Sequence, residues 1–324
     1  MRRTSPGPTV LLLGASGFIG QSILQSIVAD GETNLRVLTR RPTPLLRDSE
    51  VSIYAGDITD RSTLEEATPG VDVIVNAASY IGSDPLKAAQ VNHEGTRNLL
   101  EIGTRFGVSR FVQLSTTSVY GTGPHRGESE TSLPYAPESV TSCSRANAEQ
   151  LVLEAGGSVL RTGLIYGPGD KWFIPSMIRM ARILGGPIGC GESKLSVIDV
   201  EHLGRLVTGL LSTEARTDGP FHAAEPAPVS VGRILRHIED CVTGSRWPAR
   251  TDPADSLGLL IKSGFTDHQA ALLSQDHWYQ SDRLWKIAEL EPPTFKISTD
   301  AAIWYRRLLS DKSIDRDQEC ARLR

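Results

Sequence analysis

Residues 14–20 read GASGFIG, and they directly follow the apolar run TVLLL of residues 9–13. An apolar helical pattern comes next, so the local order is strand, tight turn and helix. Gly14 permits the tight turn, Gly17 lets backbone N–H groups approach a pyrophosphate, and Gly20 lets the helix pack closely on the strand. A glycine triad alone is weak evidence, but in this context it predicts a dinucleotide-binding turn.

Short β-rich runs alternate with helical patterns through the first two thirds of the chain. The expected strands are 9–13, 34–39, 51–54, 71–76, 110–115 and 158–161, and the expected helices are 19–29, 87–106 and 142–155. Such alternation is typical of βαβ units on a parallel sheet that is buried on both faces. We therefore expect an α/β protein with a Rossmann fold, which is a doubly wound parallel sheet.

After Tyr166 the pattern becomes irregular, which predicts a second, smaller region of mixed α/β structure that binds the substrate. We expect an NADP-binding Rossmann domain over 9–165 with part of 195–225, a substrate-binding region over 166–194 and 226–309, and a charged tail over 310–324. Residues 252–275 have no clear assignment and are a candidate mobile cap.

Composition excludes several classes of protein. The 324 residues are 39% hydrophobic and carry a formal net charge of −4, with Lys and Arg scattered along the chain, so nucleic acid and anionic membranes are poor partners. The four cysteines form no CxxC pair, and no apolar run approaches the ~20 residues of a membrane span. We expect a cytoplasmic protein without a metal site, whose partners are small molecules or, in a homodimer, itself.

The end of the second expected strand indicates which dinucleotide is bound. An acidic residue there accepts the ribose hydroxyls of NAD. Here the sequence is LRVLTRR, and Arg40, with Arg41 as a second candidate, offers a guanidinium group to a 2′-phosphate. The sequence therefore predicts NADPH, with NADH as the alternative; solvated surface arginines would also explain the pattern.

Beyond the glycine turn, the chain resembles the extended short-chain dehydrogenase/reductase family, whose members are also called NAD-dependent epimerase/dehydratase proteins. The resemblance covers residues 9–309 and rests on GASGFIG, GDITD, VNAAS, VNHEGTRNLLE, RFVQLSTTSVYG, LRTGLIYGPGD and SVIDVEHLGRLV, in that order. It implies that the cofactor is bound by Gly14, Ser16, Gly17, Phe18, Ile19, Gly20, Arg40, Asp57, Ile58, Ala77, Ala78, Arg145 and Leu164.

Two catalytic positions depart from the family pattern, which is a Ser or Thr followed by Tyr-x-x-x-Lys. Thr116 matches the first hydroxyl position, where the resemblance implies a hydrogen bond to the substrate oxygen. The stretch TSCSRANAE places Thr141 where the family has tyrosine and Arg145 where it has lysine. The chain is therefore similar to an atypical member of the family.

The family mechanism that the resemblance supplies uses the tyrosine to protonate the carbonyl oxygen, and the lysine to lower the pKa of that tyrosine. A tyrosine ionises near pKa ~10, whereas an aliphatic hydroxyl is closer to the ~15.7 of water, so Thr141 is worse as an acid by roughly 7 to 8 kcal/mol. Arg145 stays protonated and relays protons poorly. We expect neither residue to act as an acid or base, and we expect the shorter Thr141 to leave space for a broad substrate.

Three sources of the proton remain open. The substrate itself can carry an acidic proton, such as a phenol beside the ketone, so that positioning and charge stabilisation suffice. Another side chain can donate instead, and Ser118, Tyr120, His125 and Tyr166 are candidates, although each also has an ordinary structural explanation. The third possibility is that no reaction occurs.

The expected substrate pocket is apolar and aromatic. We expect Ser118, Tyr120, Trp172 and Phe173 to line it, together with Ile174, Met177 and residues 189–194. Such a surface suits an aryl ketone better than a sugar diphosphate. The leading hypothesis is an NADPH-dependent ketoreductase of secondary metabolism and antibiotic biosynthesis, which reduces an aromatic polyketide ketone of the angucyclinone type. The alternatives are a non-catalytic NADP-binding redox sensor or docking protein, and a nucleotide-sugar 4-ketoreductase or epimerase.

Overall fold

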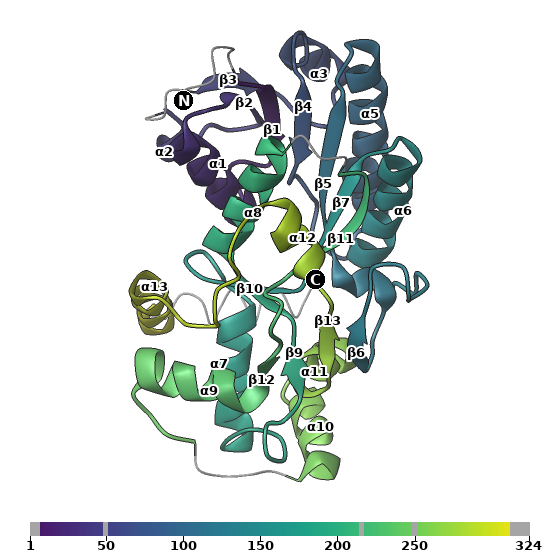
Figure 1. Ribbon diagram of the computed structural model, residues 1–324. Helices are drawn as coiled ribbons and strands as arrows, with labels where there is room; N and C mark the ends of the chain where they lie inside the picture. Colours follow the sequence, from purple (N-terminus) through teal and green to yellow (C-terminus); the bar gives the residue numbers. More distant parts are fainter. Residues whose placement is uncertain (1–6, 48–50, 214–216, 248–251, 312–324) are drawn as a thin grey trace.

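A seven-stranded parallel sheet forms the larger part of the molecule (Figure 1). The computed structural model describes residues 7–47, 51–213, 217–247 and 252–311. The strand order is β11-β7-β5-β4-β1-β2-β3, so the chain starts in the middle and winds outward in both directions, which confirms the expected doubly wound fold. The strands are β1 (Thr9–Leu13), β2 (Asn34–Thr39), β3 (Ser52–Ala55), β4 (Val73–Asn76), β5 (Arg110–Thr116), β7 (Ser158–Thr162) and β11 (Gly219–Ala223).

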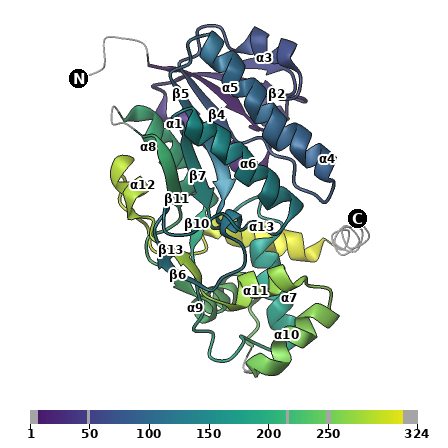
Figure 2. The same cartoon turned by 90° about the vertical axis from the view of Figure 1, so that its right-hand side faces the viewer.

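Helices cover both faces of this sheet, as Figures 1 and 2 show. The alternation of side chains along β1 explains why: Val10 and Leu12 enter one apolar core, and Leu11 and Leu13 enter another on the opposite face. One face is covered by α1 (Phe18–Asp30), α8 (Val200–Ser212) and α12 (Asp282–Ile287), and the other by α3 (Arg61–Ala67), α5 (Gly95–Arg105) and α6 (Val140–Glu154).

Short helical segments connect these layers. The expected helix 87–106 is divided into α4 (Pro85–Ala88), the π-helical η1 (Ala89–Glu94) and α5, because η1 interrupts the α-helical hydrogen-bond pattern. The other short segments are α2 (Pro44–Arg47) and the 3₁₀ turn η2 (Thr117–Tyr120).

A smaller region lies below the large sheet in Figure 1. Its four-stranded sheet has the order β12-β9-β13-β6, and a two-stranded sheet pairs β10 with β8. The strands are β6 (His125–Glu128), β8 (Leu164–Tyr166), β9 (Lys194–Leu195), β10 (Val197–Asp199), β12 (Val229–Ser230) and β13 (His277–Tyr279). The helices are α7 (Phe173–Leu184), α9 (Val231–Ile238) with its π-helical continuation η3 (Glu239–Thr243), α10 (Pro253–Lys262), α11 (Asp267–Ser274) and α13 (Thr299–Ser310).

The boundary between the two regions differs from the expected one most clearly at β6 and α12. Strand β6 lies within residues 9–165 but pairs with β13 in the smaller sheet. Helix α12 lies within 226–309 but packs on the large sheet, where the indole of Trp285 is buried and donates a hydrogen bond to the carbonyl oxygen of Ala224 at 2.7 Å. The chain therefore crosses between the regions more often than the sequence pattern indicates.

Residues 252–275, which had no clear assignment, contain helices α10 and α11. Helix α11 begins with a reciprocal capping box between Thr266 and Gln269, so its start is locally specified. In the expected charged tail, Ser310 ends α13 and residues 312–324 lie outside the described residues.

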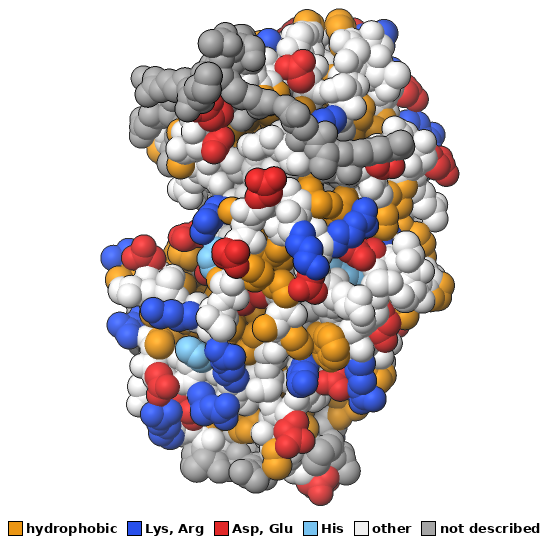
Figure 3. All heavy atoms as spheres, in the orientation of Figure 1, with side chains coloured by type: hydrophobic (Ala, Val, Ile, Leu, Met, Phe, Trp, Pro, Cys, Tyr) orange, Lys and Arg blue, Asp and Glu red, His pale blue; other side chains and the backbone are white. Residues whose placement is uncertain are grey.

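The surface shows no large field of one sign on the face drawn in Figure 3, where acidic and basic side chains are interspersed. None of the described helices is long and apolar enough to cross a lipid bilayer. Within the same described residues, no group of three or more His, Cys, Asp and Glu side chains is placed to hold a metal ion.

Candidate active site

A cavity of 310 Å³, the small cavity, opens at the carboxyl ends of β1, β2, β3 and β4. Ligands of doubly wound folds bind at this edge of the sheet. The predicted cofactor residues that line it are Gly14, Ser16, Gly17, Arg40, Asp57, Ile58, Ala77 and Ala78. Lys87 also lines it, and it was not expected from the sequence because a lysine on a surface helix carries no motif.

The glycine turn fits a bound pyrophosphate. Gly14 has φ +82°, and a Cβ there would lie 2.5 Å from the backbone of Ala77 and Ala78, so a larger residue is excluded. A Cβ at Gly17 would meet only the Gly14 carbonyl oxygen, at 3.3 Å, which leaves open space on the cavity side. Helix α1 begins after Gly17 without a side-chain cap, so its first N–H groups remain available to an anion.

Gly20 differs from the other predicted cofactor residues because it lines neither of the two cavities described here. A Cβ at this position would lie 2.0 Å from the Gly14 carbonyl oxygen. The role of Gly20 is therefore the close contact between α1 and the turn, which holds the N-terminus of the helix at the cavity.

Arg40 has a largely exposed side chain at the end of β2, and its Nε lies 3.8 Å from Asp57 Oδ2. The guanidinium group is thus held beside the small cavity by a weak ion pair rather than buried in a structural one. Arg41 is also exposed but does not line the cavity. The structure therefore distinguishes the two arginines that the sequence left as candidates.

A second cavity of 850 Å³, the large cavity, lies between the two regions of the molecule. Ser16 and Ile81 line both cavities, so the two are neighbours. The predicted site residues that line the large cavity are Phe18, Ile19, Thr116, Ser118, Thr141, Arg145, Leu164, Trp172 and Phe173. Phe18, Ile19, Arg145 and Leu164, which were expected at the cofactor, thus face this cavity rather than the small one.

Thr141 and Arg145 hold the loop that follows β4. Thr141 Oγ1 lies 3.3 Å from both the backbone nitrogen and the carbonyl oxygen of Gly82, which are long contacts. Arg145 Nε donates to Ser79 Oγ at 3.1 Å. Desolvation lowers the pKa of Arg145 to about 10 and Glu149 opposes this shift, so the guanidinium group stays charged at neutral pH.

Thr116 lies where β5 meets η2. Its Oγ1 accepts a hydrogen bond from the Ser118 backbone N–H at 3.1 Å, which caps the 3₁₀ turn. Thr116 also lines the large cavity. The hydroxyl hydrogen is not needed for the cap, so it is free to bind an oxygen of a ligand.

The prediction that Tyr120 binds substrate is wrong. Its ring is buried and does not line the large cavity. The hydroxyl accepts a hydrogen bond from Arg161 Nη1 at 2.6 Å and lies 2.7 Å from His222 Nε2. Burial raises the pKa of Tyr120 to about 12, and Arg161 only partly offsets this. Tyr120 therefore belongs to a buried network that joins the strands.

Other candidate side chains also lie in the core. Tyr166 is buried and donates its hydroxyl hydrogen to Glu225 Oε1 at 2.9 Å, and His125 is buried against Tyr120 and Tyr279. Ile174 and Met177 are fully buried within α7 and its neighbours, so the expectation that they line the substrate pocket is wrong. Residues 189–194 do not line the large cavity either.

Only the start of α7 faces the large cavity. The buried carboxylate of Asp170 accepts the backbone N–H groups of Trp172, Phe173 and Ile174 at 2.8 to 2.9 Å, and it therefore fixes the first turn of the helix. Trp172, which is 38% exposed, and Phe173 consequently form the aromatic wall.

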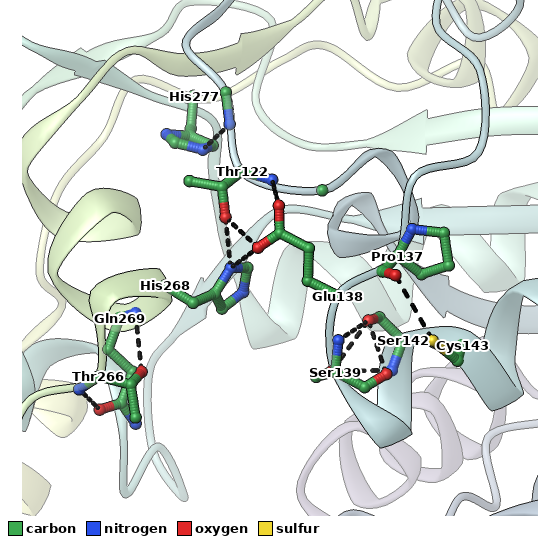
Figure 4. Close-up of polar contacts among 12 residues, drawn as sticks. Thr122, Pro137, Glu138, Ser139, Ser142, Cys143, Thr266, His268, Gln269 and His277 are labelled. Carbon is green, nitrogen blue, oxygen red and sulfur yellow. Dashed lines mark hydrogen bonds and ion pairs between the residues drawn. The ribbon is translucent and has the colours of Figure 1, made fainter.

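The smaller region adds residues that the sequence did not reveal. His268, Gln269 and His277 line the large cavity from α11 and β13, and Trp304 lines it from α13 (Figure 4 shows the three first-named residues). Their positions follow from the packing of segments that are more than 100 residues away from β5 and α6 in the sequence. No local motif marks them.

The two histidines have different hydrogen bonds. His277 Nε2 accepts the Gly123 backbone N–H at 3.1 Å, and burial lowers the pKa of His277 to about 4, so this ring is neutral. His268 Nδ1 lies 2.8 Å from Thr122 Oγ1 and 3.5 Å from Glu138 Oε2. His268 is thus held beside a carboxylate, whereas Nε2 of His277 already accepts a backbone hydrogen bond.

Comparison with known proteins gives the family. Residues 10–220 match the model of the NAD dependent epimerase/dehydratase family, and the chain belongs to that family. It is 27% identical over 302 residues to a 2-alkyl-3-oxoalkanoate reductase of Stenotrophomonas maltophilia, covering 88% of this chain and 86% of the relative. It is 30% identical over 265 residues to a 3-beta-hydroxysteroid dehydrogenase of Mycolicibacterium neoaurum, covering 71% and 72%.

A solved structure shows the same fold. A UDP-glucuronic acid 4-epimerase from Bacillus cereus, in complex with UDP-glucuronic acid and NAD, superimposes with a TM-score of 0.71 at 17% identity, covering 93% of this chain and 99% of that one. With the family match and the relatives, the chain is an NAD(P)-dependent oxidoreductase.

Proposed function

We propose that this protein is an NADPH-dependent ketoreductase of secondary metabolism that reduces an aromatic polyketide ketone of the angucyclinone type. The observation that carries the proposal is the large cavity, which adjoins the glycine turn and has an aromatic wall but a threonine at the tyrosine position. From the sequence resemblance alone, we propose further that the chain is similar to the angucyclinone ketoreductase of the simocyclinone pathway. Its relatives include a 2-alkyl-3-oxoalkanoate reductase and a 3-beta-hydroxysteroid dehydrogenase.

The cofactor is held by residues of the small cavity in this proposal. Gly17 and the first turn of α1 bind the pyrophosphate, and Arg40 binds the 2′-phosphate that distinguishes NADPH from NADH. When bound, the reduced nicotinamide supplies a hydride to the carbonyl carbon. Lys87 adds a second positive charge at the small cavity.

Thr116 and Arg145 orient the ketone rather than protonate it. Thr116 donates a hydrogen bond to the carbonyl oxygen, and the charged Arg145 stabilises the negative charge that develops there. Thr141 lacks the acidity to donate a proton. A phenol beside the ketone gives its own proton to the new alkoxide, so the substrate assists its own reduction.

Two alternatives remain as competing proposals. A nucleotide-sugar 4-ketoreductase or epimerase is favoured by the solved relatives with UDP-sugars, but Arg145 and Lys171 are the only Lys or Arg side chains that line the large cavity in the described residues. A non-catalytic NADP-binding redox sensor or docking protein needs no second cavity of 850 Å³. The partners we propose are a small aromatic ketone and, at most, a second copy of the chain.

A panel of ligands tests the proposal. Purified protein with NADPH is mixed with a bicyclic or tetracyclic aryl ketone that bears a hydroxyl peri to the carbonyl, with its methoxy analogue and with UDP-glucose. We expect loss of the nicotinamide absorbance with the hydroxy ketone and much slower loss with the methoxy ketone. Turnover of neither ketone, or interconversion of the UDP-sugar without net consumption of NADPH, would refute the proposal.

A further inference from the structure

His268 reaches the large cavity from the smaller region of the molecule. It is the second residue of α11, and its ring extends toward the segment that precedes α6, where Thr122 and Glu138 hold Nδ1 (Figure 4). The side chain is 27% exposed and lines the large cavity. A carboxylate and a hydroxyl thus fix an imidazole at the wall of the proposed substrate site.

The hydrogen bonds determine the tautomer of His268. Thr122 Oγ1 lies 2.6 Å from Glu138 Oε2, and because a carboxylate only accepts, the single hydroxyl hydrogen of Thr122 goes to Glu138. Thr122 Oγ1 must therefore accept from His268, so Nδ1 carries a hydrogen. The described residues offer no hydrogen-bond partner to Nε2, which leaves this nitrogen available to a ligand.

Several charged groups surround the ring of His268. Hydrogen bonds from Thr122, followed by the charge of His268, hold the pKa of Glu138 below its usual value, so Glu138 is ionised. Asp267 precedes His268 in α11, and the nearby His277 on β13 is neutral because burial lowers its pKa to about 4. Arg145, Lys171 and Asp170 are the other charged residues of the large cavity.

His268 differs from every other group at the large cavity in its chemistry. The hydroxyl groups of Thr116, Ser118 and Thr141 ionise far above neutral pH, and Arg145 keeps its proton. The buried His277 already uses Nε2 as an acceptor. An imidazole nitrogen can both give and accept a proton in catalysis, and the ring of His268 is also accessible to solvent.

We propose that His268 is a catalytic residue that supplies the proton consumed in ketone reduction, with Glu138 and Thr122 as positioning residues. This inference rests on the proposed function. As the carbonyl carbon accepts hydride, the substrate phenol gives its proton to the new alkoxide and becomes a phenolate. The Nε2–H bond of His268 then breaks, its proton goes to the phenolate oxygen, and the neutral imidazole keeps its Nδ1 hydrogen. Solvent returns a proton to Nε2.

Binding of the hydroxy ketone provides a test that does not depend on turnover. The probe is a bicyclic aryl ketone with a peri-hydroxyl group, bound to the protein in the presence of NADP, and its phenolate absorption is measured against pH. If His268 contacts the phenol oxygen, the pH at which the bound probe ionises should differ between the native protein and H268Q by ~1 unit or more. In H93Q, a histidine variant outside both cavities, the bound probe should ionise as it does in the native protein.

Steady-state kinetics give the second readout. In H268Q, kcat with the hydroxy ketone should fall by about 10²-fold with a smaller change in KM. The pH profile of kcat in H268Q should differ from that of the native protein, because the proposed acid is missing. The variant E138Q keeps an oxygen that can accept from Thr122 but loses the negative charge. Its kcat with the hydroxy ketone should be roughly tenfold lower than that of the native protein.

The outcomes separate this inference from the proposed function. If the native protein reduces the ketone and H268Q retains its kcat, its pH profile and the ionisation of the bound probe, the role of His268 is refuted while ketone reduction stands. If the native protein fails to oxidise NADPH with any ketone, the proposed function is refuted. In that case an unchanged ionisation of the bound probe in H268Q also refutes the contact between His268 and the phenol.

Discussion

At the scale of single residues, Thr141 tests whether the family mechanism survives in this chain. Among the described residues, its hydroxyl makes two long contacts, both with the backbone of Gly82. We therefore expect T141A to keep kcat within about threefold of the native value, because a contact at this distance is worth at most ~1 kcal/mol. Steady-state oxidation of NADPH measures this, and a loss of about 10²-fold or more would restore Thr141 as the acid.

Thr116 provides the contrast to Thr141. Its hydroxyl faces the large cavity with its hydrogen unused by the cap of η2. In T116V the hydrogen bond to the carbonyl oxygen is lost, and we expect kcat/KM to fall by roughly tenfold, which corresponds to about 1.4 kcal/mol. Equal activity of T116V and the native protein would remove Thr116 from the site.

Arg40 and Arg41 form a matched pair for cofactor preference. Both are exposed, but only Arg40 lines the small cavity. A charge-assisted hydrogen bond to phosphate is worth about 1.5 to 3 kcal/mol, so R40A should weaken binding of NADPH by roughly 10- to 100-fold and leave NADH unchanged. R41A should bind both as the native protein does. Calorimetric titration with each nucleotide measures this, and equal losses for NADPH and NADH would contradict the assignment.

At the scale of elements, Asp170 holds the first turn of α7, which carries the aromatic residues of the large cavity. Its carboxylate is 3% exposed and accepts three backbone N–H groups of the first turn as well as the hydroxyl hydrogen of Tyr305 on α13. D170A leaves these buried donors without acceptors, so we expect the free energy of unfolding to fall by about 3 kcal/mol or more. Urea denaturation measures the change.

An exposed cap is the control for Asp170. Asp84 accepts the backbone N–H groups of Leu86 and Lys87 at the start of α4, where water can replace the carboxylate. D84A should lower the free energy of unfolding by only about 1 kcal/mol. Similar effects of the two substitutions would mean that Asp170 is an ordinary surface cap.

The central elements were predictable because their signals are local. Strand β1 is five consecutive apolar or β-branched residues, and the glycine turn after it has steric requirements that no other residue meets at Gly14. Strands β9 and β12 contain only two residues each and exist because distant segments pair with them. Such short strands carry no periodicity, so the smaller sheet could not be predicted from the sequence.

The residues of the candidate site also fall into those with a local sequence signal and those placed by packing between distant segments. Thr116, Thr141 and Arg145 were placed by motif spacing along one continuous stretch of the family pattern. His268 was missed because its partner Glu138 lies 130 positions away and α11 had no assignment of its own. Tyr120 was misjudged because the sequence cannot show that Arg161 and His222 meet its hydroxyl in the core. Residues that depend on packing between the two regions are therefore the ones that need the structure.

At the scale of the whole molecule, the two sheets are joined by buried polar groups as well as by apolar contacts. His222 on β11 of the large sheet is fully buried, and its Nδ1 lies 2.9 Å from the carbonyl oxygen of Gln280, which follows β13 of the smaller sheet. Its Nε2 faces the Tyr120 hydroxyl at 2.7 Å. A neutral ring satisfies both contacts, with Nδ1–H as the donor and Nε2 as the acceptor.

The buried contacts of His222 should make the free energy of unfolding depend on pH. Burial lowers the pKa of His222 from 6.5 to about 4. Between pH 6.5 and about pH 4, His222 is therefore protonated in the unfolded chain but neutral in the folded protein. The contribution of His222 to stability is complete above about pH 6.5 and is lost as the pH falls toward about 4, by an amount on the order of 3 kcal/mol. Asp199 has the opposite sign, because burial raises its pKa to about 6 and the folded protein gains stability as this group is protonated.

Comparison with H222Q isolates the histidine, since Asp199 and the buried His277 titrate in both proteins. Glutamine offers one donor and one acceptor but no ionisation, so H222Q should be less stable than the native protein near neutral pH while losing less stability on acidification. Urea denaturation at about pH 7 and about pH 4.5 measures the two changes, whose difference should be roughly 2.5 kcal/mol. Equal losses of stability on acidification in the two proteins would contradict this prediction. They would mean that His222 is already protonated in the folded protein, so that an imidazolium rather than a neutral imidazole lies between the two sheets.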